Sequence, residues 1–288
     1  MTQPILVPLD GSQLAEQALP YAQKLAEPGC QLILLEVGQD DDDLGLLDRH
    51  ADSCARLETA VGDPAEQILQ VARDLNVGLI VMTTHGRGAL GRWAFGSVAD
   101  AVTRTSPVPV LVVRPQRGDT EIAPVIQRVV VPLDGSPLAE EALPTATSLA
   151  QRLHVPVHLV TAIDVIEIMP TVAFDASLYE ETVAQLEAGA TTWLTQAAKQ
   201  LQHEGVATTW AILRGSPFLA ITDAVKPGDV IVMTSRGLDG AKRWLLGSLA
   251  EKLIREGSVP VVLVPTGERD NEVPVAGDAA QLVSPVLA

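Results

Sequence analysis

Glycine, serine and aspartate recur in this chain at spacings that suit the binding of a phosphorylated small molecule. Gly86 is separated by nine residues from Gly96-Ser97, and the same G-x9-G-S pattern recurs at Gly237 and Gly247-Ser248. A glycine lets the backbone approach a phosphate closely, and a helix that begins at Gly-Ser presents N–H groups that attract anions. Glycines that only form turns are the plainer interpretation, but the repetition with the serine retained favours an anion site.

Two aspartates stand at the ends of short apolar segments. Asp10 and Asp134 each follow such a segment and precede Gly-Ser. An aspartate in this position commonly shapes a turn or caps a helix. The functional alternative is a hydrogen bond to an adenine base or to ribose hydroxyls, and the sequence leaves both interpretations open.

The motifs recur because the chain contains two copies of one unit. Residues 7–26 and 131–150 are identical at 15 of 20 positions, and the chain has 288 residues, the length of two ordinary domains. We predict a first domain over residues 1–115, a linker over 116–126, a second domain over 127–265 and a tail without regular structure over 266–288.

Short apolar segments alternate with helical ones in each copy. In the first copy, strands are predicted at 5–9, 32–37, 54–61, 79–83 and 108–113, and helices at 14–26, 64–75 and 91–104. Pro20 and Pro144 are expected to kink the first helix of each copy rather than end it. The alternation implies an α/β fold with one open parallel sheet of about five strands per copy, helices on both faces and ligands at the carboxyl ends of the strands.

The two copies differ between their second and third strands. The second copy is longer there and is predicted to contain a full crossover helix at 177–203, whereas the helix of the first copy is expected to be shortened or missing. The run 40–43 of four aspartates in the first copy invites a calcium or magnesium site, but adjacent carboxylates on a loop are more often simply solvated. We predict no metal ligands among the protein side chains.

Composition narrows the classes of partner. The formal net charge is −16, which repels nucleic acid and anionic membranes. No apolar run approaches the length of about 20 residues that spans a bilayer. Cys30 and Cys54 are the two cysteines, without a C-x-x-C or metal-binding spacing. We therefore expect a reduced, cytoplasmic protein whose partners include neither nucleic acid nor membrane.

The ordered set of motifs resembles the universal stress protein family in a tandem form. The motifs are the VPLDGS opening, the VMTTHGRG and VMTSRG strand ends, the G-x9-G-S spacing and a last strand of the VPVLVV type. The resemblance covers nearly the whole chain except the linker and the tail. It implies Rossmann-like or flavodoxin-like domains that bind ATP, which Mg²⁺ could accompany. It also implies that the last strands of the two copies, within 108–113 and 259–264, pair with each other in an intramolecular pseudo-dimer, and it leaves a homodimer of chains open.

The resemblance assigns one nucleotide site to each copy. In the first copy the site residues are Pro8, Asp10, Val37, Met82, Thr83, Gly86, Gly96, Ser97 and Val98. In the second copy they are Pro132, Asp134, Ala162, Met233, Thr234, Gly237, Gly247, Ser248 and Leu249. Thr83 and Thr234 stand where the ATP-binding members have a leading glycine, so occupation of both sites, one site or neither stays open.

These observations favour a stress-response or regulatory protein that binds an adenine nucleotide. One alternative is a pairing scaffold of the same fold that binds no nucleotide. Another is an enzyme, because residues 86–91 also fit the dinucleotide pattern G-x-G-x-x-G, but that pattern belongs after the first strand and here follows the fourth. Neither a Walker A lysine nor a G-x-S-x-G elbow is present, so we expect at most weak ATP hydrolysis.

Overall fold

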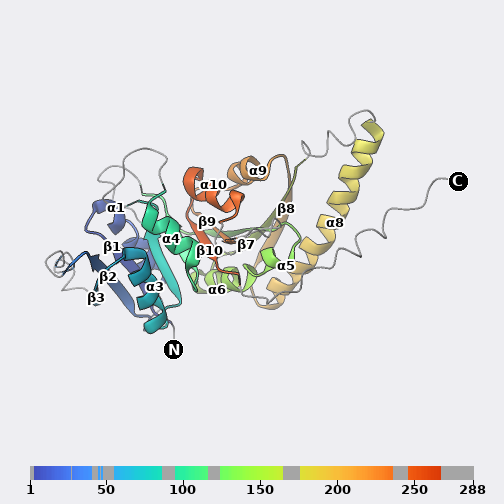
Figure 1. The fold of residues 1–288 in the computed structure, drawn as a ribbon. Helices are drawn as coiled ribbons and strands as arrows, with labels where there is room; N and C mark the ends of the chain where they lie inside the picture. The colour runs from blue at the N-terminus through green and yellow to red at the C-terminus, as the bar shows by residue number, and fades with distance from the viewer. Residues whose placement is uncertain are drawn as a thin grey trace, which may run out of the picture.

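The chain folds into two α/β halves that share one sheet (Figure 1). The computed structural model describes residues 3–26, 28–40, 45, 47, 55–85, 95–115, 124–164, 176–235 and 246–266. The first half comprises β1 (Ile5–Leu9), α1 (Gln13–Glu16), α2 (Leu19–Leu25), β2 (Leu32–Gly38), β3 (Arg56–Val61), α3 (Pro64–Asp74), β4 (Leu79–Thr83), α4 (Ser97–Thr105) and β5 (Val110–Val113). The second half comprises β6 (Arg128–Pro132), α5 (Pro137–Glu140), α6 (Leu143–Leu153), β7 (Val157–Ile163), α8 (Ala176–His203), β8 (Thr208–Arg214), α9 (Pro217–Ala224), β9 (Asp229–Thr234), α10 (Ser248–Glu256) and β10 (Val261–Val264).

The ten strands follow the order β3-β2-β1-β4-β5-β10-β9-β6-β7-β8. Neighbouring strands are parallel within each half, as the strand and helix alternation predicts. The exception is the central pair, in which β10 runs antiparallel to β5 and Val262 lies opposite Leu111. This pairing covers the edge that each half would otherwise expose. The predicted α/β fold and intramolecular pseudo-dimer are therefore confirmed.

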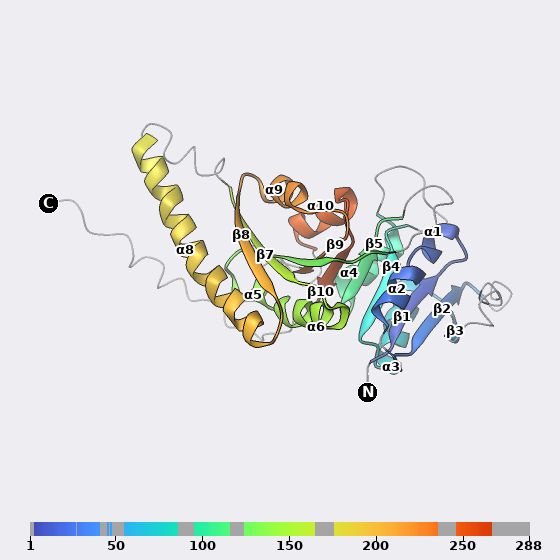
Figure 2. The ribbon, with the colours of Figure 1, turned by 180° about the vertical axis from the view of Figure 1, so that it is seen from behind.

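Alternate residues of each buried strand enter two separate core layers. In β1, Ile5 and Val7 pack on the face that carries α2, while Leu6 packs on the face that carries α3. Figures 1 and 2, seen from opposite sides, show α3 and α4 over one face of the first half and α1 and α2 over the other. Both faces of the sheet are thus covered, which explains why its strands lack polar alternation.

The first helix of each copy is divided in two, contrary to the expected kink. Ser12 caps α1, and its Oγ accepts a hydrogen bond from the Ala15 N–H at 3.1 Å. The helix then ends at Glu16, and α2 begins at Leu19 with Pro20 in its first turn. A proline is tolerated there because the first N–H groups of a helix have no partner within the helix. In the second copy, Pro144 occupies the same place in α6.

Further boundaries differ from the predicted ones, among them the start of β5 at Val110 rather than at residue 108. The third strand begins at Arg56, and the fourth helix begins at Ser97 rather than at residue 91, since Phe95 and Gly96 are not helical. The predicted crossover helix of the second copy is present as α8. Most of the corresponding connection in the first copy, including aspartates 41–43, lies outside the described residues. Over the part of the chain that is described, no cluster of three or more His, Cys, Asp or Glu side chains could hold a metal ion.

Candidate functional site

A cavity of about 310 Å³ lies in the first half at the carboxyl ends of its strands. This is the edge of an open parallel sheet where ligands are expected. Its volume falls within the range of about 300–1,000 Å³ typical of small-molecule sites. The lining residues are Pro8, Leu9, Asp10, Ala15, Leu35, Val37, Pro64, Ile68, Met82, Thr83, Thr84, His85, Gly96, Ser97, Val98 and Ala99. The cavity therefore brings together every residue predicted for the first site except Gly86, which lies outside the described residues.

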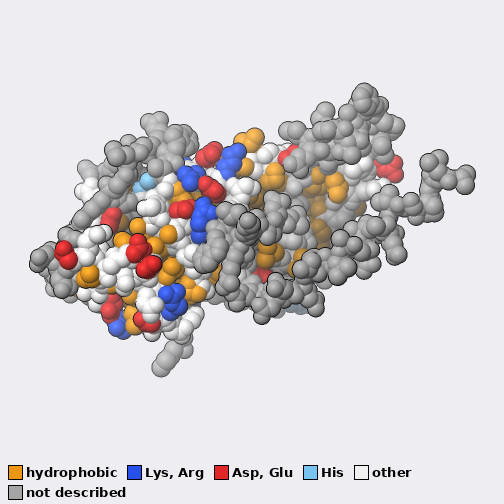
Figure 3. All heavy atoms as spheres, viewed as in Figure 1, with side chains coloured by type: hydrophobic (Ala, Val, Ile, Leu, Met, Phe, Trp, Pro, Cys, Tyr) orange, Lys and Arg blue, Asp and Glu red, His pale blue; other side chains and the backbone are white. Residues whose placement is uncertain are grey.

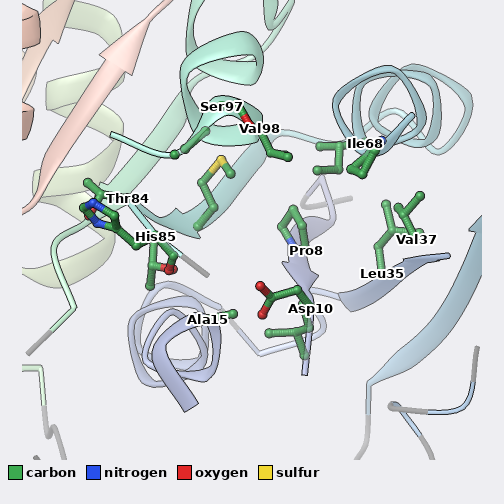
Figure 4. Close-up of a pocket in the computed structure, with 16 residues that line it drawn as sticks. Pro8, Asp10, Ala15, Leu35, Val37, Ile68, Thr84, His85, Ser97 and Val98 are labelled. Atoms are coloured by element: carbon green, nitrogen blue, oxygen red, sulfur yellow. The ribbon is translucent and has the colours of Figure 1, made fainter. Parts of the chain in front are cut away.

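The apolar wall of the cavity comes from β2, β4 and α3. Leu35 and Val37 lie two positions apart on β2 and so point to the same face of the sheet. Figure 4 shows these two side chains beside Ile68, with Thr84 and His85 on the opposite side. Met82 of β4 also lines the cavity and is buried. The wall suits a flat, weakly polar ring.

Helix α4 points its amino terminus at the cavity. Among the described residues, no side chain caps this helix, and the N–H groups of Ser97, Val98 and Ala99 have no hydrogen-bond partner. The N–H of Asp100 is the first that is bonded within the turn, to the Gly96 carbonyl at 2.8 Å. Three aligned donors at the positive end of a helix dipole are an arrangement that can bind an anion.

Gly96 itself does not offer its N–H to a ligand, which corrects the expectation from the sequence. The Gly96 N–H donates to the Thr84 carbonyl at 2.9 Å. A Cβ on Gly96 would lie 3.0 Å from the same carbonyl oxygen, and φ is −61°, within reach of any residue. Glycine is therefore suited to this position by the close approach of the loop after β4. The donors that remain available belong to the following three residues.

Asp10 shapes a turn, as one of the two interpretations of the sequence predicts, and it also lines the cavity. Its Oδ1 accepts hydrogen bonds from the Ser12 N–H at 3.0 Å and from the Ser12 Oγ at 2.6 Å, so it shapes the turn after β1. Gly11 in this turn has φ of +78°, a conformation that favours glycine. The half-buried carboxylate of Asp10 also lines the cavity (Figure 4). It is the acidic side chain among the described lining residues.

The segment after β4 is held by its own side chains. The Thr83 hydroxyl donates to the His85 carbonyl at 2.7 Å, and the Thr84 hydroxyl lies 2.7 Å from His85 Nδ1. Thr83, at the position where the resemblance implies a glycine, is buried and uses its hydroxyl within the protein. Its side chain shapes the wall of the cavity and gives its only hydroxyl proton to the loop.

The second copy repeats these positions. Pro132, Asp134 and Ala162 lie at the ends of β6 and β7, Met233 and Thr234 end β9, and Gly247, Ser248 and Leu249 begin α10. The Gly247 N–H donates to the Ser235 carbonyl at 2.8 Å, as Gly96 does to Thr84. Asp134, however, is exposed where Asp10 is half-buried. Gly237 lies outside the described residues.

Sequence reasoning missed several residues of the cavity wall. Leu35 could have been predicted from the sequence, because Val37 was predicted and residues two positions apart on a strand share a face. Ile68 and Ala15 lie on helices whose packing the sequence alone does not fix. The four basic residues 87, 92, 242 and 243, which could balance phosphate charge, lie outside the described residues. The described lining contains neither lysine nor arginine.

Comparisons with known proteins agree with the motifs. The model of the universal stress protein family matches residues 40–114 and 126–265. A universal stress protein of Mycobacterium bovis is 26% identical over 211 residues, which cover 72% of this chain and 67% of the relative. One of Methanocaldococcus jannaschii is 32% identical over 142 residues, covering 48% of this chain and 81% of the relative.

Solved structures show the same fold. The crystal structure of a universal stress protein from Archaeoglobus fulgidus matches with a TM-score of 0.62 and 21% identity, covering 92% of this chain and 98% of that one. In the described part of this chain, no helix has the length and apolar character needed to cross a bilayer. Since the family model matches most of the sequence in two successive segments, this chain belongs to the universal stress protein family, in a tandem form.

Proposed function

We propose that this protein binds an adenine nucleotide, ATP in the first instance, in the cavity of its first half and acts as a regulatory protein of the stress response. The observation that carries the proposal is the meeting, in one cavity, of an apolar wall, a carboxylate and three N–H donors that have no partner among the described residues. In this arrangement the base packs against Val37 and Met82. The Asp10 carboxylate accepts hydrogen bonds from ribose hydroxyls, and the phosphates meet the amino terminus of α4.

The negative net charge of the chain means that attraction for the phosphates has to come from groups in the cavity. A net charge of −16 opposes the approach of a polyanion. Favourable charge must therefore come from the site, and the end of a helix contributes about 0.3–1 kcal/mol, or about 2 kcal/mol when partly buried. Mg²⁺ bound to the phosphates would lower the charge that the protein has to neutralise. We propose the corresponding residues of the second half as a second site of the same kind.

The test is to denature the purified protein, identify any released nucleotide by chromatography, and then titrate the emptied protein with ATP by calorimetry. Val37→Glu places a carboxylate on the proposed wall for the base, and we expect it to weaken binding at least tenfold, about 1.4 kcal/mol. Val61→Glu is the matched control, because Val61 is 43% exposed on the neighbouring strand β3 and does not line the cavity. Equal ATP affinity for both variants would contradict the proposed site, and no binding by the parent protein would leave the pairing scaffold as the better account.

A further inference from the structure

Helices α4 and α10 lie side by side where the two halves meet (Figures 1 and 2). Both begin at a Gly-Ser and occupy equivalent places in their own half. Each helix carries an internal ion pair: Arg104 with Asp100 at 2.8 Å in α4, and Arg255 with Glu251 at 2.9 Å in α10. Arg104 also lies 4.0 Å from Glu251 of the other half. Figure 3 shows basic and acidic side chains gathered over these helices.

The contacts across the junction are not symmetric. The guanidinium of Arg255 lies 5.6 Å from the centroid of the Phe95 ring, close enough for a cation–π interaction. The residue that corresponds to Phe95 in the second half is Leu246, which has no aromatic face. Arg255 of the second half therefore contacts an aromatic ring of the first half. Arg104, the equivalent residue of the first half, has Leu246 rather than an aromatic residue at the corresponding position of the second half.

Phe95 directly precedes the end of α4 that faces the cavity. The next residue, Gly96, is the N-cap of the helix, and its N–H and carbonyl bond to Thr84 and Asp100, respectively. Phe95 is partly buried against the core on this face of the sheet. A displacement of its ring would move the N-cap and with it the donors of Ser97 to Ala99, which follow without a break.

We propose that Arg255 is a positioning residue for the nucleotide site of the first half: from the second half, it holds Phe95 and so aims the amino terminus of α4 into the cavity. The proposal rests on the proposed function in naming the ligand, but the contact itself is independent of it. Cation–π interactions at partly exposed sites contribute about 0.5–1 kcal/mol. If most of this contribution serves to order the helix end, its loss weakens binding about two- to fivefold.

The test compares Arg255→Met with Arg104→Met. Both variants remove a guanidinium from the same network, but only the first removes the contact with Phe95. We expect Arg255→Met and Phe95→Leu each to raise the Kd for ATP about two- to fivefold, and the double variant to raise it no further. Arg255→Lys, which retains the cation, should restore most of the affinity, and Arg104→Met should bind as the parent protein does.

A second readout needs no nucleotide. Hydrogen exchange of the Gly96 amide reports the order of the N-cap, since this N–H is bonded to the Thr84 carbonyl, and Arg255→Met should accelerate it while Arg104→Met does not. Equal effects of the two arginine variants on affinity and exchange, or no effect of Arg255→Met on either, would overturn the proposal. Absence of ATP binding by the parent protein would defeat the proposed function, and the exchange rates would still decide whether Arg255 positions the helix end.

Discussion

The buried carboxylate of Glu36 leads to the most specific prediction about the fold. Glu36 lies on β2 and is 1% exposed. It accepts hydrogen bonds from the Gly45 N–H at 3.1 Å and from the Leu47 N–H at 3.3 Å, both in the short connection that replaces the long helix of the second half. At the equivalent position of β7 the second half has Thr161, where α8 makes the crossing instead. Glu36 thus fastens the short connection to the sheet.

The change Glu36→Thr installs the residue of the second half and leaves two backbone donors without their acceptor. Each unsatisfied donor costs about 1–3 kcal/mol, and relief from burying a carboxylate offsets part of that sum, so we expect a loss of about 2 kcal/mol in the free energy of unfolding. Glu36→Gln retains one acceptor oxygen and should lose about 1 kcal/mol. Urea unfolding at neutral pH measures both values.

The matched control for this series is Glu58→Thr on the neighbouring strand. Glu58 pairs with Arg56 at the surface, and such pairs contribute at most about 1 kcal/mol. The reasoning would be refuted if Glu36→Thr unfolded within about 0.5 kcal/mol of the parent protein, or if Glu58→Thr were equally destabilising.

Three further predictions concern stability. Asp229→Ala should cost about 3 kcal/mol in urea unfolding, because it leaves the guanidinium of Arg128, which bonds Asp229 at 2.6 Å, without its buried partner; a loss below about 1 kcal/mol would contradict this. Gly11→Ala should cost about 1–2 kcal/mol because φ is +78° there, and an unchanged melting temperature would show that the turn relaxes. Burial lowers the pKa of His158 below its usual 6.5 in the folded protein. As pH falls through 6.5, the unfolded chain takes up the proton first, and the stability of the folded protein declines. His158→Gln should therefore reduce the change of the melting temperature between about pH 7 and pH 5. The control His203→Gln, at an exposed histidine, should leave that change as it is in the parent protein.

Much of the fold could be predicted because short continuous apolar segments alternate with helical ones and the whole unit occurs twice. Continuous apolar segments such as 79–83 became buried parallel strands, and the repeated opening located both halves. The helix boundaries were harder to predict. Pro20 was read as an interruption of one helix, although a proline is equally at home in the first turn of the next. The start of α4 was placed too early because the sequence does not reveal that Gly96 is held by the Thr84 carbonyl.

The candidate site was predictable where it follows from strand ends and failed where it depends on packing between elements. Val37 and Met82 lie near the carboxyl ends of β2 and β4, and Asp10 directly follows β1, the strand between them. Topology alone therefore brings the three residues together. The contact of Arg255 with Phe95 joins residues far apart in the sequence, and no local pattern signals it. The hydrogen bonds of Glu36 span only 9 and 11 positions, but they depend on the path of an irregular connection that no motif marks. The N–H donors for a ligand were predicted at Gly96-Ser97. The Gly96 N–H instead donates to the Thr84 carbonyl, and among the described residues the N–H groups of Ser97 to Ala99 have no partner.

The central claim is that backbone N–H groups in the first turn of α4 bind the phosphates of a nucleotide. The most direct test is to follow the backbone amide resonances of Ser97, Val98 and Ala99 by NMR while ATP is added, with adenosine in a parallel titration. The account predicts saturable shifts of these three amides with ATP that adenosine does not reproduce. Amides that stay unmoved by ATP, or that move equally with adenosine, would contradict it.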